Sequence, residues 1–132
     1  VIAPVGGGGL ISGTAIALDS VDVPLYGVEP EGAAETIASL VANERITHLV
    51  PDTFCDGLRA VVGVPNFAII QEHVLQVLSV TDAQCEVAQT LVAEHLKMVI
   101  EPSSATVLAA VFAYPDLYKG QRVGLIVTGG NV

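Results

Sequence analysis

The chain has 132 residues, of which 52% are hydrophobic and 14% are charged, and 14 acidic residues against 5 basic ones give a formal net charge of -9. This length predicts a single domain over residues 1–132, and the acidic balance argues against nucleic acid as a partner. No apolar run is long enough to span a bilayer and no signal-like segment opens the chain, so we expect a cytoplasmic protein that contacts no membrane.

The hydrophobic pattern alternates between strands, which are apolar throughout, and helices, which have apolar residues at helical spacing. In chain order it predicts a strand at 1–5, a helix at 10–18, a strand at 25–28, an irregular stretch at 43–57, a short helix at 67–73, a strand at 75–80, a helix from 82 to about 99, a helix from 103 or 104 to just before 114, and a strand at 123–127. Thr81 and Gln84 form a capping box at the start of the longest helix. The alternation is typical of an α/β fold in three layers, with a mainly parallel sheet and helices on both faces.

Four consecutive glycines, Gly6 to Gly9, join the first predicted strand to the first predicted helix. Glycine lets the backbone turn sharply and present consecutive N–H groups, and the following helix adds its positive N-terminal end. The run therefore predicts a phosphate site. A flexible connection is the alternative, although a floppy linker is a poor join between a core strand and a core helix.

The spacing of these glycines and their neighbours does not by itself identify which phosphate-containing compound binds. A P-loop requires a lysine at the end of the glycine run, and no lysine precedes Lys97, which excludes that class of nucleotide hydrolase. A dinucleotide-binding fingerprint nearly fits, because Gly7 and Gly9 are followed by Ser12 and because Glu29 ends the next predicted strand.

Five motifs occur in order along the chain: Ala3-Pro4-Val5-Gly6-Gly7-Gly8-Gly9-Leu10, Tyr26-Gly27-Val28-Glu29-Pro30, Cys55-Asp56-Gly57-Leu58-Arg59, Ile100-Glu101-Pro102-Ser103-Ser104 and Val127-Thr128-Gly129-Gly130-Asn131-Val132. Together they resemble the C-terminal part of the serine racemase and threonine dehydratase family of pyridoxal-phosphate enzymes, fold type II. The similarity is greatest to the branch with serine racemase and threo-3-hydroxyaspartate ammonia-lyase. We therefore expect this chain to be part of a larger catalytic polypeptide.

The resemblance implies pyridoxal 5'-phosphate as the cofactor, with its phosphate held by the tetraglycine loop. Thr128 would offer its hydroxyl group to the pyridine nitrogen. Asp56 and Glu101 match positions near the cofactor and are the candidate catalytic carboxylates, and the alternative for Glu101 is an exposed acid at the end of a helix. The implied cofactor-binding residues are Gly6, Gly7, Gly8, Gly9, Leu10, Gly57 and Thr128.

Racemase-like members of this family also bind a divalent cation. The resemblance implies Glu29, the carbonyl group of Ala33 and Glu35 as ligands of Mg²⁺ or Ca²⁺, since both ions prefer oxygen donors. The family usually has Asp where Glu35 stands. Cys55 and Cys85 are far apart in the sequence and form no C-x-x-C motif, so we expect free, partly buried thiols rather than a disulfide or a zinc site. The three histidines, His48, His73 and His95, share no metal-ligand spacing, and we expect structural or surface roles for them.

Two departures from the family bear on activity. Ala60 stands where racemases often have a serine that contacts the substrate carboxylate. The family's Schiff-base lysine belongs to an N-terminal motif that these residues do not contain, and the two lysines present, Lys97 and Lys119, are predicted to be solvated.

The sequence supports two hypotheses about function. In the first, the chain is the cofactor-phosphate-binding portion of an enzyme, expected to be a homodimer, that eliminates ammonia from, or racemises, serine, threonine or 3-hydroxyaspartate. In the second, it is a catalytically inert α/β binding domain for a nucleotide or a regulatory ligand, without the lysine.

Overall fold

A parallel sheet forms the centre of the computed structural model, which describes residues 1–132. Its strands are β1 (Ile2–Pro4), β2 (Tyr26–Pro30) and β3 (Gln76–Val80), in the order β1-β2-β3. Ala3 is paired with Gly27, and Gly27 with Val77. The carboxyl ends of all three strands therefore lie at one edge of the sheet.

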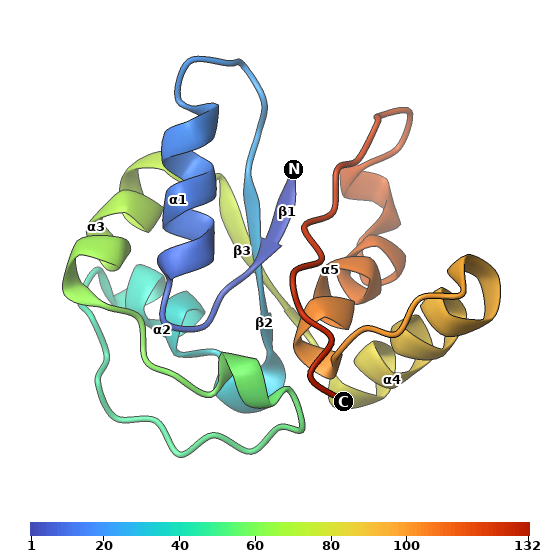
Figure 1. The fold of residues 1–132 in the computed structure, drawn as a ribbon. Coiled ribbons are helices and arrows are strands. Elements are labelled where there is room, and N and C mark those ends of the chain that lie inside the picture. Colours follow the sequence, from blue (N-terminus) through green and yellow to red (C-terminus); the bar gives the residue numbers. More distant parts are fainter.

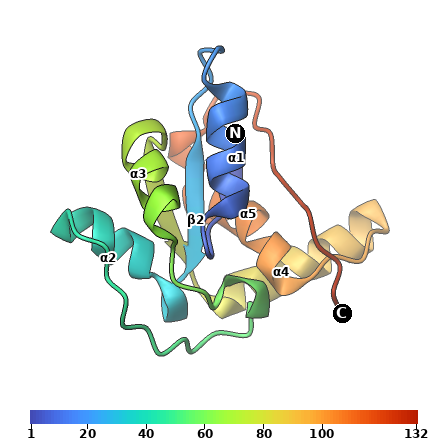
Figure 2. The same cartoon turned by 60° about the vertical axis from the view of Figure 1, so that its left-hand side comes forward.

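Five helices cover the two faces of this sheet (Figure 1). On one face lie α1 (Gly9–Leu18), α2 (Glu35–Ala42) and α3 (Val64–His73), and on the other lie α4 (Asp82–Leu91) and α5 (Pro102–Ala113). Figure 2 shows β2 between α3 and α5 after a turn of 60°. The predicted α/β fold with three layers is confirmed. No helix here combines the length and the apolar character needed to cross a membrane.

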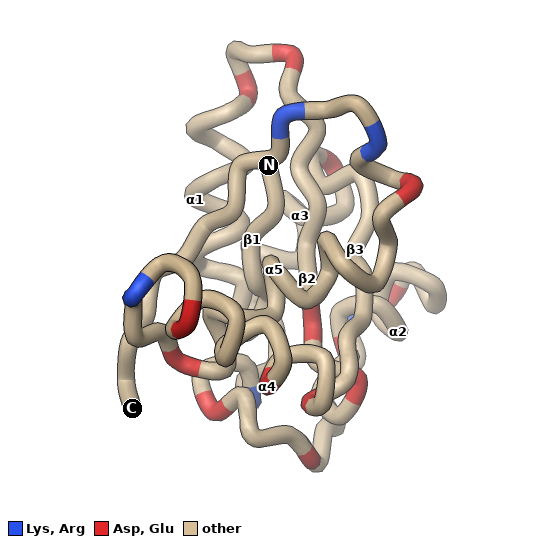
Figure 3. Tube along the Cα trace, turned by 90° about the vertical axis from the view of Figure 1, so that its right-hand side faces the viewer, with Lys and Arg blue, Asp and Glu red and all other residues tan.

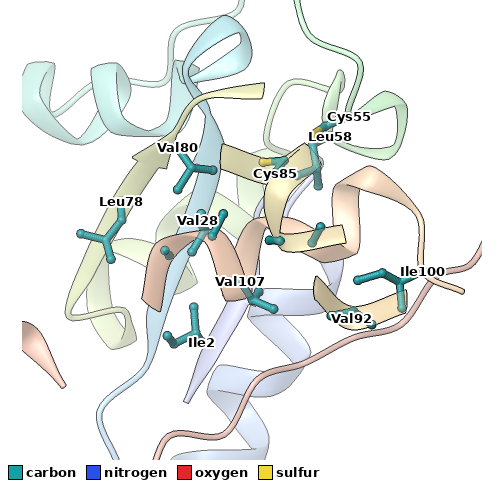
Figure 4. Close-up of a cluster of buried hydrophobic side chains, with 14 of the residues drawn as sticks. Ile2, Val28, Cys55, Leu58, Leu78, Val80, Cys85, Val92, Ile100 and Val107 are labelled. Atoms are coloured by element: carbon teal, nitrogen blue, oxygen red, sulfur yellow. The ribbon is translucent and has the colours of Figure 1, made fainter. Parts of the chain in front are cut away.

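The core consists of two clusters, one on each face of the sheet. Successive strand residues point to opposite faces, so Val77 belongs to the cluster under α1 and α3, whereas Leu78 belongs to the cluster under α4 and α5. Figure 4 shows the second cluster, in which Ile2 and Val28 from the strands lie near Val107 of α5. Burial of both sheet faces explains why the strands are apolar throughout.

Residues 123–127 do not form the buried strand that the sequence predicted. This segment makes a single parallel bridge, between Leu125 and Ile2, in which the Ile2 N–H donates to Gly124 O at 2.9 Å and the Ile126 N–H donates to Ile2 O at 3.0 Å. β1 is only three residues long and offers few further partners. The segment lies outside β1 at the edge of the sheet, and Val127 is 40% exposed.

Two helix predictions also need correction. The helix predicted from 82 to about 99 is α-helical only to Leu91, continues as a π-helix over Val92–Leu96, and ends at Lys97, whose φ of 55° is left-handed. The apolar residues beyond it do not pack inward, since Val99 is 74% exposed. The hydrophobic pattern did not predict α2, an eight-residue helix without a side-chain N-cap. The other predicted helices and strands are present, with ends that differ by a few residues.

The predicted capping box at the start of α4 is confirmed. The Gln84 N–H donates to Thr81 Oγ1 at 3.1 Å, and the Thr81 N–H donates to Gln84 Oε1 at 2.9 Å. Each bond gives an otherwise unpaired group at the helix start a partner.

We predict that Thr81→Ala lowers the free energy of unfolding by about 1 kcal/mol, because it removes the acceptor for the Gln84 N–H. Urea unfolding followed by circular dichroism measures this change. Thr81→Ser keeps the hydroxyl group and is expected to retain most of the stability. Equal losses in the two variants would contradict the capping role.

Candidate functional site

A cavity of about 210 Å³ opens where β1 ends, at the carboxyl edge of the sheet. Ligands of open parallel sheets gather at this edge. Residues from four of the five sequence motifs meet there. The lining residues are Pro4, Gly6, Gly7, Gly8, Gly9, Leu10, Gly57, Leu58, Glu101, Ser103, Ser104 and Thr128.

The tetraglycine loop presents its backbone to this cavity. The N–H groups of Gly6 to Gly9 donate to no protein acceptor, whereas the carbonyl groups of Gly7 and Gly8 accept the N–H groups of Gly63 and Ser12. Gly8 is the N-cap of α1 with a left-handed φ of 88°. Consecutive unpaired N–H groups at a helix N-terminus attract an anion, so the loop has the geometry of a phosphate site.

Close packing explains why glycine is needed in this loop. A Cβ atom on Gly8 would lie 2.7 Å from Asn66 Cβ and 2.8 Å from Val62 Cγ2. A Cβ atom on Gly6 would lie 3.0 Å from the carbonyl oxygen of Gly57. Two segments from other parts of the chain therefore press against the loop and fix its path.

The C-terminal segment supplies the other predicted cofactor residue. Thr128 lies next to the cavity, and its hydroxyl group makes no hydrogen bond within the protein. Glu101, the N-cap of α5, is half-buried, lines the same cavity and accepts the Asn131 N–H on Oε2 at 3.1 Å. It therefore precedes a helix rather than ending one.

Asp56 is not among the residues that line the cavity. It is exposed at the start of a 3-10 turn, Asp56–Leu58, and only its neighbours Gly57 and Leu58 reach the cavity. Ala60 lies close by, since a Cβ atom on Gly7 would be 3.9 Å from the Ala60 methyl group. The side chain at position 60 therefore adjoins the loop.

The predicted metal ligands lie away from this cavity. Glu29 is fully buried, and its carboxylate accepts the N–H groups of Thr36 and Ile37 at 3.2 and 3.1 Å. Glu35 is also buried, and its Oε1 accepts the Val62 N–H at 3.2 Å while its Oε2 has no partner. The backbone directly after Glu35 thus binds the Glu29 carboxylate, whereas the Glu35 carboxylate binds the backbone of Val62.

Burial governs the ionisation of both acids. It raises the pKa of Glu29 to about 7, and the negative charge of Glu35 adds to that increase while the N–H donors oppose it. Burial also raises the pKa of Glu35. Each carboxyl group therefore holds its proton to a higher pH than an exposed glutamate.

Neither lysine lies at the cavity. Lys97 is exposed, and its Nζ donates to Glu94 O at 2.7 Å, while Lys119 is exposed near Gly120.

The histidines form no metal site. His48 and His95 are exposed, and half-buried His73 lies 3.5 Å from an Asp19 oxygen. No group of three or more His, Cys, Asp and Glu side chains is arranged to hold a metal ion.

Four lining residues were not predicted from the sequence: Pro4, Leu58, Ser103 and Ser104. All four lie inside the sequence motifs, at most three positions from a predicted site residue. The signal for the two serines is their position after Pro102, which marks the first turn of a helix.

Comparison with known proteins defines the class of this protein. A model of the family described as "Pyridoxal-phosphate dependent enzyme" matches residues 1–129. The chain therefore belongs to the family of pyridoxal-phosphate dependent enzymes.

Within that family, the chain is 43% identical to a serine racemase from Dictyostelium discoideum, over 100% of this chain and 43% of that protein. It is 39% identical to a beta-hydroxyaspartate dehydratase from Paracoccus denitrificans, over 100% of this chain and 42% of that protein. The structure of maize serine racemase superposes with a TM-score of 0.94 and 35% identity, covering 99% of this chain and 43% of the other. The chain thus spans less than half the length of these relatives.

We predict that Gly8→Ala lowers the free energy of unfolding by at least about 1 to 2 kcal/mol, since alanine is strained at a left-handed φ and its Cβ atom would meet Asn66 and Val62. Gly9→Ala is the matched control, because a Cβ atom there meets nothing within 4 Å. Urea unfolding compares the two. Equal stability of both variants would contradict this loop geometry.

Proposed function

We propose that this chain is the cofactor-phosphate-binding portion of a pyridoxal-phosphate-dependent enzyme that removes ammonia from, or racemises, a small hydroxy amino acid. One observation supports this most: all seven residues expected to bind the cofactor line a single cavity. The relatives of the chain include a serine racemase and a beta-hydroxyaspartate dehydratase, which favours serine or 3-hydroxyaspartate among the expected substrates.

In this proposal the loop anchors the cofactor through its phosphate. The unpaired N–H groups of Gly6 to Gly9 would donate to the phosphate oxygens, and the N-terminus of α1 would add its positive end. The cavity fits this group because all four loop glycines line it and none has a side chain that would fill it. Gly57 and Leu10 also line the cavity.

The hydroxyl group of Thr128 would bind the pyridine nitrogen. The bound cofactor supplies an electron sink for the reacting carbon. A neutral hydroxyl group, unlike a carboxylate, does not favour a proton on that nitrogen. Thr128 would thus hold the ring in place while leaving it a moderate electron sink, which suits elimination or reprotonation at the α-carbon.

We propose that the lysine that binds the cofactor covalently comes from a part of the enzyme outside these residues. Lys97 and Lys119 are exposed and do not line the cavity, and the chain spans 43% of the racemase from Dictyostelium. The homodimeric state and the cytoplasmic location stay predictions.

We predict that the purified chain binds pyridoxal phosphate without a covalent bond and turns over neither L-serine nor L-threonine. Pyridoxal, which lacks the phosphate, should bind at least about tenfold more weakly, because it cannot use the loop N–H groups. Calorimetry with pyridoxal phosphate, pyridoxal, inorganic phosphate and ATP makes the comparison. Preference for ATP would favour the inert nucleotide-binding alternative, and equal affinity for pyridoxal would overturn the role of the loop.

We also propose that Glu29, Glu35 and the carbonyl group of Ala33 hold Mg²⁺ or Ca²⁺. Both carboxylates are buried, the negative charge of Glu35 acts on Glu29, and Oε2 of Glu35 is buried without any partner. Such a pair is costly to bury without a compensating positive charge. Hard divalent cations take carboxylate and carbonyl oxygens, so the donors fit this group.

We predict a pH-dependent effect of the cation on stability. In EDTA, burial holds the pKa of folded Glu29 at about 7, against 4.5 for an ordinary glutamate. The folded state therefore binds more protons in this window, and the free energy of unfolding falls as the pH rises through it. Millimolar Ca²⁺ or Mg²⁺ at about pH 7.5 should raise the melting temperature by a few degrees.

Two variants test the assignment of this site. Glu35→Gln can still accept the Val62 N–H but loses its charge, so the cation should no longer raise its melting temperature. Glu31→Gln, an exposed acid in the same segment, should respond like the unmodified chain. A melting temperature that is insensitive to both cations in the unmodified chain would disprove the site.

A further inference from the structure

The first turn of α5 carries two adjacent buried serines, Ser103 and Ser104, which are 3% and 2% exposed. Both line the cavity. Buried hydroxyl groups are paired in native proteins, and each of these two accepts a backbone N–H from a distant segment. Gly57, the partner of Ser103, lines the cavity itself, and Gly129, the partner of Ser104, directly follows the lining residue Thr128.

Ser103 holds the segment that supports the glycine loop. Its Oγ accepts the Gly57 N–H at 3.0 Å. The carbonyl oxygen of Gly57 in turn lies so close to Gly6 that a Cβ atom there would be 3.0 Å away. The position of the loop start therefore depends on Gly57, and the position of Gly57 depends on the Ser103 hydroxyl group.

Ser104 holds the segment that carries Thr128. Its Oγ accepts the Gly129 N–H at 3.0 Å, and the Gly129 carbonyl oxygen accepts the Glu101 N–H at 3.1 Å. A Cβ atom on Gly129 would overlap the carboxyl group of Glu101. The residue after Thr128 is thus bound through both its N–H and its carbonyl group by the start of α5.

Helix geometry lets one element perform both tasks. Successive residues of an α-helix are about 100° apart around its axis, so adjacent hydroxyl groups reach different segments. We infer that Ser103 and Ser104 are positioning residues that set the relative placement of Gly57 and Thr128 around the cofactor. This inference rests on the proposed function for its ligand, and on the two hydrogen bonds for its geometry.

The test measures amide hydrogen exchange by NMR in the ligand-free chain, and pyridoxal phosphate affinity by calorimetry. In Ser103→Ala the Gly57 amide should exchange on the order of tenfold faster, with Gly129 unchanged. In Ser104→Ala the Gly129 amide should exchange faster, with Gly57 unchanged. Each variant should bind pyridoxal phosphate about fivefold more weakly, the equivalent of one hydrogen bond.

Ser39→Ala is the matched control. Ser39 is a fully buried serine on α2 whose Oγ accepts the Ile46 N–H at 2.9 Å, and it does not line the cavity. This variant should lose stability but leave the exchange of Gly57 and Gly129 and the cofactor affinity unchanged.

The outcomes separate this inference from the proposed function. The positioning role is supported if only the Gly57 amide exchanges faster in Ser103→Ala, only the Gly129 amide exchanges faster in Ser104→Ala, and both variants bind the cofactor more weakly. Faster exchange of both glycines in all three variants would show general destabilisation and overturn it, as would selective exchange with unchanged affinity. If the unmodified chain binds no pyridoxal phosphate, the proposed function fails, while an exchange pattern that is still selective supports the two hydrogen bonds.

Discussion

The central feature of the cavity is the set of unpaired N–H groups of Gly6 to Gly9, and the surrounding structure keeps them unpaired. Backbone donors without a partner are unfavourable unless water or a ligand accepts from them, so the surroundings must keep the loop open. A left-handed Gly8 turns the chain into α1, and Gly57 lies directly behind Gly6. The end of β1 places the loop at the carboxyl edge of the sheet, where three other segments of the chain line the same cavity.

The chain is acidic, yet the cavity beside the glycine loop has the geometry of an anion site. The net charge is -9, and Figure 3 shows Asp and Glu at many places along the chain and few Lys or Arg. None of the residues that line the cavity is basic. Attraction must therefore come from oriented backbone dipoles, which act over a few ångströms. A negative net charge argues against long polyanions as partners, but it is compatible with one small phosphate group held at short range.

The sequence predicted the features whose causes are local. Four glycines after an apolar strand define the loop, and Thr81 with Gln84 defines a cap, because both patterns act within a few residues. The sequence did not predict α2, which has no side-chain N-cap, or the loose attachment of 123–127, which depends on how short β1 is. The roles of Ser103 and Ser104 were also missed, since their partners lie 46 and 25 residues away along the chain. Contacts of that kind leave no periodic pattern to detect.

An anchor made of main-chain N–H groups has an evolutionary consequence. No side-chain substitution outside the loop can delete it directly, because the donors are present whatever residues surround them. Positions such as Ala60, which adjoins Gly7, are then free to diverge between descendants of one ancestor. A lineage can thus retain its coenzyme while its substrate preference drifts.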